Sequence, residues 1–95
     1  MNVAIEQKDD GKKGRFELYE EGKRIGELEY TWTGRDRFII GHTEVDKNHG
    51  GKGHAKNLVL QAIEFARKEK LTIIPLCPYA KSVFDKDKSL ADVLD

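Results

Sequence analysis

The chain has 95 residues, the length of one ordinary domain, with nothing left over for a second. A chain of this size buries about 65% of the surface that its unfolded form exposes, which is enough for a modest core. Its 17 basic and 17 acidic side chains cancel, so a nucleic-acid-binding protein built on a basic excess is not expected. The only cysteine, Cys77, cannot form an internal disulfide, which suits a reducing compartment.

The sequence contains no apolar run long enough to cross a membrane, and its first residues lack the apolar core of a signal peptide. We therefore expect a cytoplasmic protein that binds neither membranes nor nucleic acid. The hydrophobic content of 38% is too high for a disordered chain. We expect a monomer or a weak homodimer.

Four segments in the first half alternate apolar and polar residues, or are apolar throughout, as strands do. The first begins at Val3, and the other three cover residues 16–20, 25–32 and 38–45. Glu21 and Gly22 can turn the chain tightly, so the second and third strands should form an antiparallel hairpin. The fourth strand is apolar on both faces at its start, which predicts a position inside the sheet.

One long helix is predicted after the glycine-rich residues 50–53, because apolar residues then recur at three- and four-residue steps. Its apolar face consists of Ala55, Leu58, Val59, Ala62, Phe65 and Ala66. Residues 71–76 should then form a buried strand parallel to the fourth, completing a βαβ unit. Two short helices are expected at residues 79–84 and 89–94, the second capped by Ser89.

These elements predict an α+β fold in a single domain, residues 1–95. An antiparallel meander leads into the βαβ unit and gives a compact mixed sheet with one long helix and short C-terminal helices.

The glycine-rich segment is the most informative part of the sequence for function. Gly50, Gly51, Lys52 and Gly53 lie where a helix begins, and a helix start has unpaired N–H groups and a partial positive charge. Glycines let a phosphate approach the backbone, and Lys52 adds a cation. The segment is therefore predicted to cradle a diphosphate; the alternative is a plain strand-to-helix turn.

Two common phosphate-binding motifs do not fit this segment. The P-loop needs Gly where Asp46 stands and Ser or Thr where Gly53 stands. The dinucleotide fingerprint needs a third glycine where Lys56 stands. Neither a P-loop nucleotide site nor a Rossmann site is therefore predicted.

The fourth strand carries two candidate proton acceptors, His42 and Glu44. In a regular strand they share one face with Phe38 and Ile40 and lie about 7 Å apart along the chain. Both can then reach one substrate. The alternative is that they are ordinary solvated residues at a strand end.

Cys77 ends the last strand between Pro75 and Pro78, two residues that limit strand pairing. It is either an inert small apolar residue or a reactive thiol, depending on a thiol pKa that the sequence does not report. The order His-x-Glu followed by Pro and Cys is similar to that of zinc deaminases, but these need P-C-x-x-C, whose second cysteine is replaced here by Ala80. We therefore expect no metal site.

Taken together, several segments resemble the small single-domain, acetyl-CoA-binding members of the GNAT acyltransferase superfamily. They are HTEV, GGKGHAKNLVLQAIEFA, LTIIPLCPYAKSVFDK and SLADVLD. The resemblance implies an acetyl-CoA-dependent N-acetyltransferase that acts on an amine of a protein or small molecule. The alternative is a CoA or acyl-CoA binding module without turnover. A bare protein-interaction domain would leave the glycine-rich loop unexplained.

The superfamily's phosphate-binding loop, [QR]-x-x-G-x-[GA], maps to residues 50–55. Gly53 and Ala55 fit its small positions, whereas Gly50 replaces the expected Gln or Arg, so one side-chain contact should be missing. The resemblance implies contacts to acetyl-CoA or CoA from the fourth strand, the loop, the helix start and the segment after Cys77. This set is Thr43, Val45, Gly50, Gly51, Lys52, Gly53, His54, Ala55, Lys56, Pro78 and Tyr79.

The resemblance also implies that the two parallel strands splay apart around the pantetheine arm and that the thioester ends near Cys77 and residues 42–44. The candidate catalytic residues are Cys77, His42 and Glu44. His42 is the first choice as base because its unperturbed pKa lies near neutrality, and Cys77 either carries the acetyl group or lies beside it. Only residues 9–14 stand where larger members have acceptor-binding helices, so the site should be open.

Overall fold

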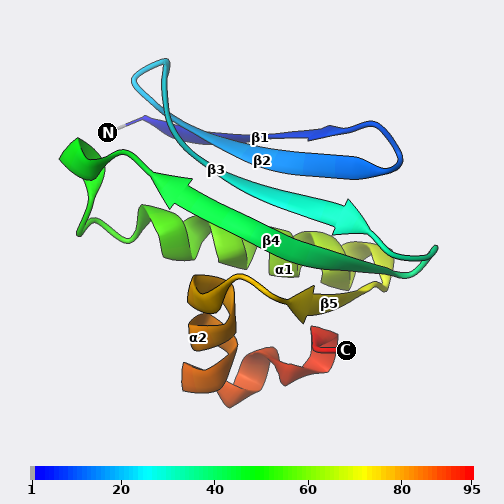
Figure 1. Cartoon of the computed structure of the whole chain (residues 1–95). Coiled ribbons are helices and arrows are strands. Elements are labelled where there is room, and N and C mark those ends of the chain that lie inside the picture. The colour runs from blue at the N-terminus through cyan, green and yellow to red at the C-terminus, as the bar shows by residue number, and fades with distance from the viewer. Residues whose placement is uncertain (1) are drawn as a thin grey trace.

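The computed structural model describes residues 2–95 and contains one sheet, with strands in the order β1-β2-β3-β4-β5 (Figure 1). Neighbouring strands are antiparallel from β1 to β4, whereas β5 is parallel to β4. The strands are β1 Val3–Asp9, β2 Lys13–Glu20, β3 Lys23–Trp32, β4 Arg37–Val45 and β5 Thr72–Pro75. The predicted α+β fold, with its meander and βαβ unit, is confirmed.

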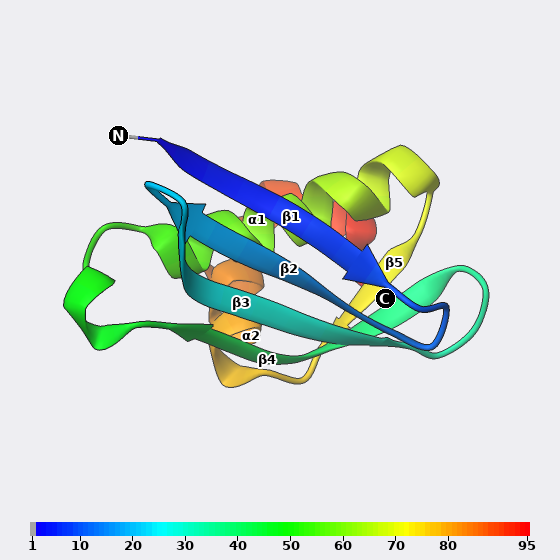
Figure 2. The same ribbon diagram turned by 90° about the horizontal axis from the view of Figure 1, so that it is seen from above.

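The helices lie on one side of the sheet. They are the 3-10 turn η1 Lys47–His49, the long helix α1 His54–Glu69, α2 Pro78–Lys86 and the 3-10 segment η2 Lys88–Val93. Helix α1 contacts β2, β3, β4 and β5, and α2 packs against α1, β4 and β5. Figure 2 shows β1 to β4 in front of both helices. In the described chain no helix covers the opposite face of the sheet, called here the open face.

The hairpin turn between β2 and β3 forms as expected. Glu21 and Gly22 both have positive φ, 52° and 80°, the geometry of a two-residue turn whose twist matches that of the strands. Residues 10–12 connect β1 to β2, and Asp10 Oδ1 accepts hydrogen bonds from the N–H groups of Lys12 and Lys13. This connection contains no helix.

The core lies between α1 and the sheet and contains a cluster of aromatic rings whose centroids are 4.8 to 6.1 Å apart. The cluster consists of Phe16, Tyr30, Trp32, Phe38 and Phe65. The predicted apolar face of α1 is largely correct, but it omitted Ile63, which is 1% exposed, and His54, which is also buried.

Strand β4 contains a β-bulge that the alternation pattern did not predict. Along the β3–β4 pair, Glu29 lies opposite His42 but Tyr30 lies opposite Ile40, so Gly41 is an extra residue on β4. A bulge of this kind exchanges the two faces of the strand beyond it.

The exchange reverses one expectation for the candidate catalytic residues. Phe38 and Ile40 are buried beneath the helices, whereas His42 and Glu44 are exposed. Thr43 pairs with the buried Leu28 and so lies on the helix side. The prediction that His42 and Glu44 share a face with Phe38 and Ile40 is therefore wrong, although the two do face the same way.

The C-terminal third differs from expectation in two places. Residues 71–76 were expected to form a buried strand, but β5 covers only Thr72–Pro75 and lies at the end of the strand order. Ile73 is buried, whereas Leu76, beyond the strand, is 66% exposed. Segment η2 is capped by Asp87, whose Oδ1 accepts the N–H of Ser89; Ser89 is thus not the cap. Within residues 2–95, none of the helices is long and apolar enough to cross a membrane.

Gly14 in β2 provides a test of how the core is packed. A Cβ at this position would lie 2.3 Å from the Tyr30 ring, and Tyr30 is fixed because its hydroxyl donates to Asp9. We expect Gly14→Ala to lower the free energy of unfolding by about 1–3 kcal/mol, the usual cost of overpacking, measured by urea denaturation. Gly41→Ala is the matched control, since its Cβ would meet no atom within 4 Å; equal losses in both variants would refute this account.

A buried carboxylate lies on the open face. The Glu17 side chain is 2% exposed, and its oxygens lie 2.8 Å from Lys8 Nζ and 2.7 Å from Arg15 Nε. The Tyr19 hydroxyl donates to the same carboxylate. Hydrogen bonds from Lys8 and Arg15 lower the pKa of Glu17 to about 2.

This arrangement predicts an acid-dependent contribution to stability. A carboxyl group whose pKa is lowered by folding stabilises the protein at pH values above its ordinary pKa. That stabilisation is lost as the pH falls to the folded-state pKa. At pH 7 we expect Glu17→Gln to cost about 1–2 kcal/mol, less than a fully buried pair because the cations are half-exposed. The difference from wild type should shrink as the pH falls from 4.5 toward about 2, measured by urea denaturation; a difference independent of pH would contradict it.

Candidate functional site

The two parallel strands separate at a defined point. Pairing between β4 and β5 ends at Ile40 and Pro75, and beyond the bulge at Gly41 residues 42–45 are paired only with β3. The N–H groups of Leu76 and Cys77 both donate to the Ile40 carbonyl, at 3.1 and 3.0 Å, before the chain enters α2. One edge of the β4 end is thus left unpaired by β5, and the starts of α1 and α2 lie at this end of the sheet (Figure 1).

The start of α1 offers a continuous run of free backbone donors. From Gly51 to Lys56, no backbone N–H group donates to another residue in the described chain, and the first helical bond is Asn57 N–H to the Gly53 carbonyl at 3.0 Å. Gly51 and Gly53 have φ of 75° and 79°, a conformation that side chains other than glycine rarely adopt. Free donors and the helix dipole together favour an anion here.

The predicted cofactor-binding residues differ in how they can contribute. Lys52 and Lys56 are exposed, so both charges are free to meet an anion, while Ala55 is half-buried. The His54 side chain is 6% exposed and packs against Glu20, so His54 can offer only its backbone N–H.

Pro78 and Tyr79 begin α2 on the other side of the gap. Tyr79 is 39% exposed, and it helps to form a cavity of about 310 Å³ that lies between the start of α1 and the length of α2. The cavity is lined by Lys56, Tyr79, Ser82, Val83, Lys86 and Asp87. The sequence-predicted set is therefore gathered around the unpaired end of β4.

Cys77 lies at the N-cap position of α2, is 7% exposed, and its thiol donates to the Thr43 hydroxyl at 3.6 Å. Burial raises the pKa of the Cys77 thiol, but the N–H of Ala80, the Thr43 hydroxyl and the N–H of Tyr79 outweigh it. The net pKa lies below its ordinary value. The helix start thus favours the thiolate, as it does other anions.

His42 and Glu44 form a second pair on the open face. His42 Nε2 lies 3.1 Å from Glu44 Oε2, and both side chains are exposed. The two pairs, Cys77 with Thr43 and His42 with Glu44, therefore lie on opposite sides of β4, and the structure shows no contact between His42 and Cys77 among residues 2–95.

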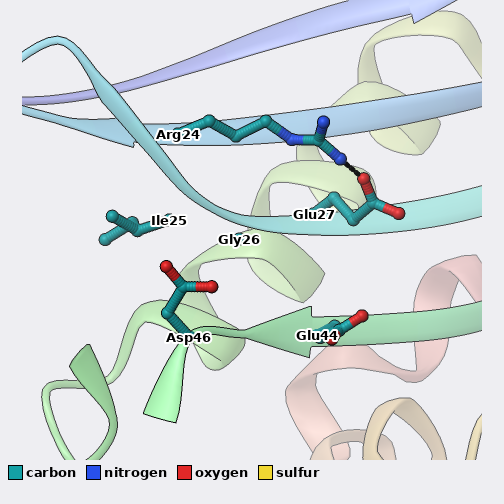
Figure 3. Close-up of a pocket in the computed structure, with 6 residues that line it drawn as sticks. All are labelled: Arg24, Ile25, Gly26, Glu27, Glu44 and Asp46. Atoms are coloured by element: carbon teal, nitrogen blue, oxygen red, sulfur yellow. Dashed lines mark ion pairs between the residues drawn. The ribbon is translucent and has the colours of Figure 1, made fainter. Parts of the chain in front are cut away.

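A cavity of about 270 Å³ adjoins Glu44 between the beginning of β3 and the end of β4 (Figure 3). It is lined by Arg24, Ile25, Gly26, Glu27, Glu44 and Asp46. Arg24 forms an ion pair with Glu27. The other two carboxylates of the lining, Glu44 and Asp46, have no cationic partner among the lining residues. Glu29 and His42 lie close by, with ligand atoms within 4.8 Å of one another and of Glu27. The cavity is therefore electronegative.

Comparison with known proteins decides the family. Residues 15–93 match the sequence profile of the GCN5-related N-acetyl-transferase family. The chain belongs to this family.

Solved structures agree with this assignment. A GCN5-like protein from Staphylococcus aureus is 30% identical, with a TM-score of 0.74 over 97% of this chain and 87% of that one. An IAA acetyltransferase from Bacillus cereus is 16% identical, with a TM-score of 0.71 over 90% and 75% of the two chains. AAC(6′)-Iy, solved with a CoA-containing bisubstrate analogue, is 12% identical, with a TM-score of 0.66 over 95% and 90%. None of the curated proteins matches this sequence.

The sequence did not predict the side-chain contacts of two residues of this GCN5-related chain. Thr43 was expected only as a contact to the cofactor from the fourth strand, but its hydroxyl also contacts Cys77. Glu20 was read only as part of a strand, but it contacts His54 beneath the loop. The isolated Gly41 within a strand was a usable signal for the bulge that turns Thr43 inward; nothing local in the sequence indicates the contact of Glu20.

The contact between Thr43 and Cys77 can be tested by alkylation, because the protein has one cysteine. The rate of reaction with iodoacetamide should rise with a midpoint below the ordinary thiol pKa of about 8.5. Thr43→Val keeps the shape but removes the hydroxyl, so we expect its midpoint to move to higher pH. Thr31→Val, on an exposed position of β3, is the control; a shift in this variant, or none in Thr43→Val, would exclude Thr43 as the cause.

Proposed function

We propose that the protein is an acetyl-CoA-dependent N-acetyltransferase that acetylates an amine on a protein or small molecule. One observation carries the proposal: the free N–H groups from Gly51 to Lys56 begin α1 beside the unpaired edge of β4. Membership of the GCN5-related family supports it. So does AAC(6′)-Iy, which has the same fold and was solved with a CoA derivative.

The roles of the binding residues follow from their geometry. The diphosphate of acetyl-CoA accepts hydrogen bonds from the loop amides, while Lys52 and Lys56 supply charge. The backbone from Thr43 to Val45 has an edge without a β5 partner, against which the pantetheine arm can pair as a further strand does. The thioester then ends near the Thr43–Cys77 pair. Pro78 and Tyr79 line the opposite side of the gap.

The chemistry requires the acceptor amine to lose a proton. His42 or Glu44 takes it, directly or through water, as the nitrogen attacks the thioester carbonyl. A C–N bond forms, the C–S bond breaks, and the departing CoA thiolate takes up a proton. A thioester in the gap along the β4 edge can be reached from both faces of the strand, so an amine on the open face can attack it beside His42 and Glu44. His42 and Cys77 lie on opposite faces and form no pair in the described chain, so direct transfer is favoured over an acetyl-cysteine formed by a Cys77–His42 pair. The electronegative cavity beside Glu44 attracts a protonated amine to this side.

A second function has its own support. Gly50 stands where other members have Gln or Arg, and only residues 10–12 connect β1 and β2, so the chain has little surface to hold an acceptor. Both features favour a CoA-binding module without turnover.

The two functions are separated by binding and turnover assays on the same samples. We expect CoA to raise the melting temperature, since a ligand at 100 times its Kd adds about 2.7 kcal/mol of stability. Gly53→Ala should lose this shift because its φ of 79° disfavours alanine. Acetyl transfer to a panel of amines should fall at least tenfold in His42→Ala. Binding without transfer in the wild type would leave only the CoA-binding module, and no binding would remove both functions.

The route of the acetyl group is tested with Cys77→Ser and intact-protein mass spectrometry. Direct transfer predicts that wild-type protein mixed with acetyl-CoA gains no acetyl group on Cys77 and that Cys77→Ser keeps measurable turnover. An acetylated Cys77 that forms and decays at the rate of turnover, with an inactive Cys77→Ser, would establish the covalent route instead.

A further inference from the structure

A buried carboxylate and two imidazoles meet beneath the glycine-rich loop. Glu20, at the end of β2, is 8% exposed and lies on the helix side of the sheet. Its Oε2 is 3.3 Å from His54 Nε2 at the start of α1, and its Oε1 is 3.6 Å from His49 Nδ1 in η1. These three residues are called here the loop clasp. The ends of β2, η1 and the start of α1 lie at the same end of the sheet (Figure 1).

The loop clasp joins the two ends of the diphosphate-binding segment. His49 immediately precedes Gly50, and His54 immediately follows Gly53. Between them, the only loop N–H group that donates to the backbone of the described chain is that of Gly50, to the Lys47 carbonyl at 3.3 Å; the Gly53 carbonyl accepts the first helical bond, from Asn57. Glu20 is thus the residue outside the segment that contacts both of its ends.

The contacts of the loop clasp are close but poorly aligned. Glu20 Oε2, His49 Nδ1 and both ring nitrogens of His54 are buried and form no regular hydrogen bond among residues 2–95. Buried polar groups in this condition are costly, and few occur in a native protein. None of the three side chains has a role in the acetyl transfer described above, so their burial here needs another reason.

We propose that Glu20 is a positioning residue for the diphosphate of the acetyl-CoA substrate, acting through His49 and His54. By fixing both ends of a glycine segment, it holds the free N–H groups in one conformation and lowers the entropy lost when the anion binds. The inference rests on the proposed function because it assigns acetyl-CoA or CoA to the loop.

Two substitutions separate positioning from charge. Glu20→Met keeps the length of the side chain but has no oxygen to contact either imidazole, whereas Glu20→Gln loses the charge and keeps one polar oxygen at the same place. Positioning predicts that Glu20→Met weakens CoA binding about tenfold, equivalent to about 1.4 kcal/mol, and that Glu20→Gln stays within threefold of wild type. Glu21→Gln, one residue further and exposed in the turn, is the control.

The measurements are the Kd for CoA by titration calorimetry and kcat/KM for acetyl-CoA and for S-acetylpantetheine, which lacks the diphosphate. Glu20→Met should raise KM for acetyl-CoA, leave its kcat unchanged, and leave the reaction with S-acetylpantetheine unchanged. Equal losses with both thioesters would mean that Glu20 only supports the fold and would overturn the proposal. Equal Kd values in Glu20→Met and wild type, or equal weakening in Glu20→Met and Glu20→Gln, would also overturn it.

If Glu20→Met does not fold, His49→Ala replaces it, because His49 is partly exposed and outside the core. It should weaken CoA binding about threefold without affecting S-acetylpantetheine, and an unchanged Kd would count against the proposal. A wild-type protein that binds CoA but transfers no acetyl group refutes the enzyme, and the calorimetry still decides the role of Glu20. A wild-type protein that does not bind CoA refutes the proposed function and this inference together.

Discussion

The site depends on the early end of pairing between β4 and β5. The Leu76 N–H makes the last ladder bond, to the Ile40 carbonyl, and the Cys77 N–H turns back to the same carbonyl. Pro78, the next residue whose backbone would face β4 in a continued ladder, has no N–H to donate. The rest of β4 keeps a free edge, and the starts of α1 and α2 face the same gap. Had β5 continued in register, this edge would be saturated and no arm of a ligand could pair with it.

Most of the fold could be predicted because its signals are local. The hairpin follows from Glu21–Gly22, and α1 follows from the spacing of its apolar residues after the glycines. The exchange of faces at Gly41 could not be read from alternation, since one extra residue reverses every position beyond it. The contact between Glu20 and His54 joins residues far apart in the sequence, so no local pattern indicates it.

The site combines a well-defined half with an open half. In the proposed function, the half that binds the diphosphate is held by backbone geometry: positive φ at Gly51 and Gly53, and free amides at a helix start. The acceptor half consists of exposed side chains around Glu44 on a sheet face without helices. Under the proposed function, the cofactor is bound mainly by backbone groups, and the choice of acceptor depends on exposed side chains that can vary without disturbing the fold.

The ion pairs of Glu17 affect how the open face of the sheet can interact with other molecules. The Glu17 carboxylate is buried on the open face by the stems and charged ends of its neighbours, chiefly Lys8 and Arg15. These charged side chains, which are about half-exposed to solvent, cover this part of the open face in place of a second layer of helices. A second sheet packed against this face would have to desolvate these charged groups, which costs free energy. The uncovered face of the sheet is thereby disfavoured as a surface for face-to-face stacking with a second sheet.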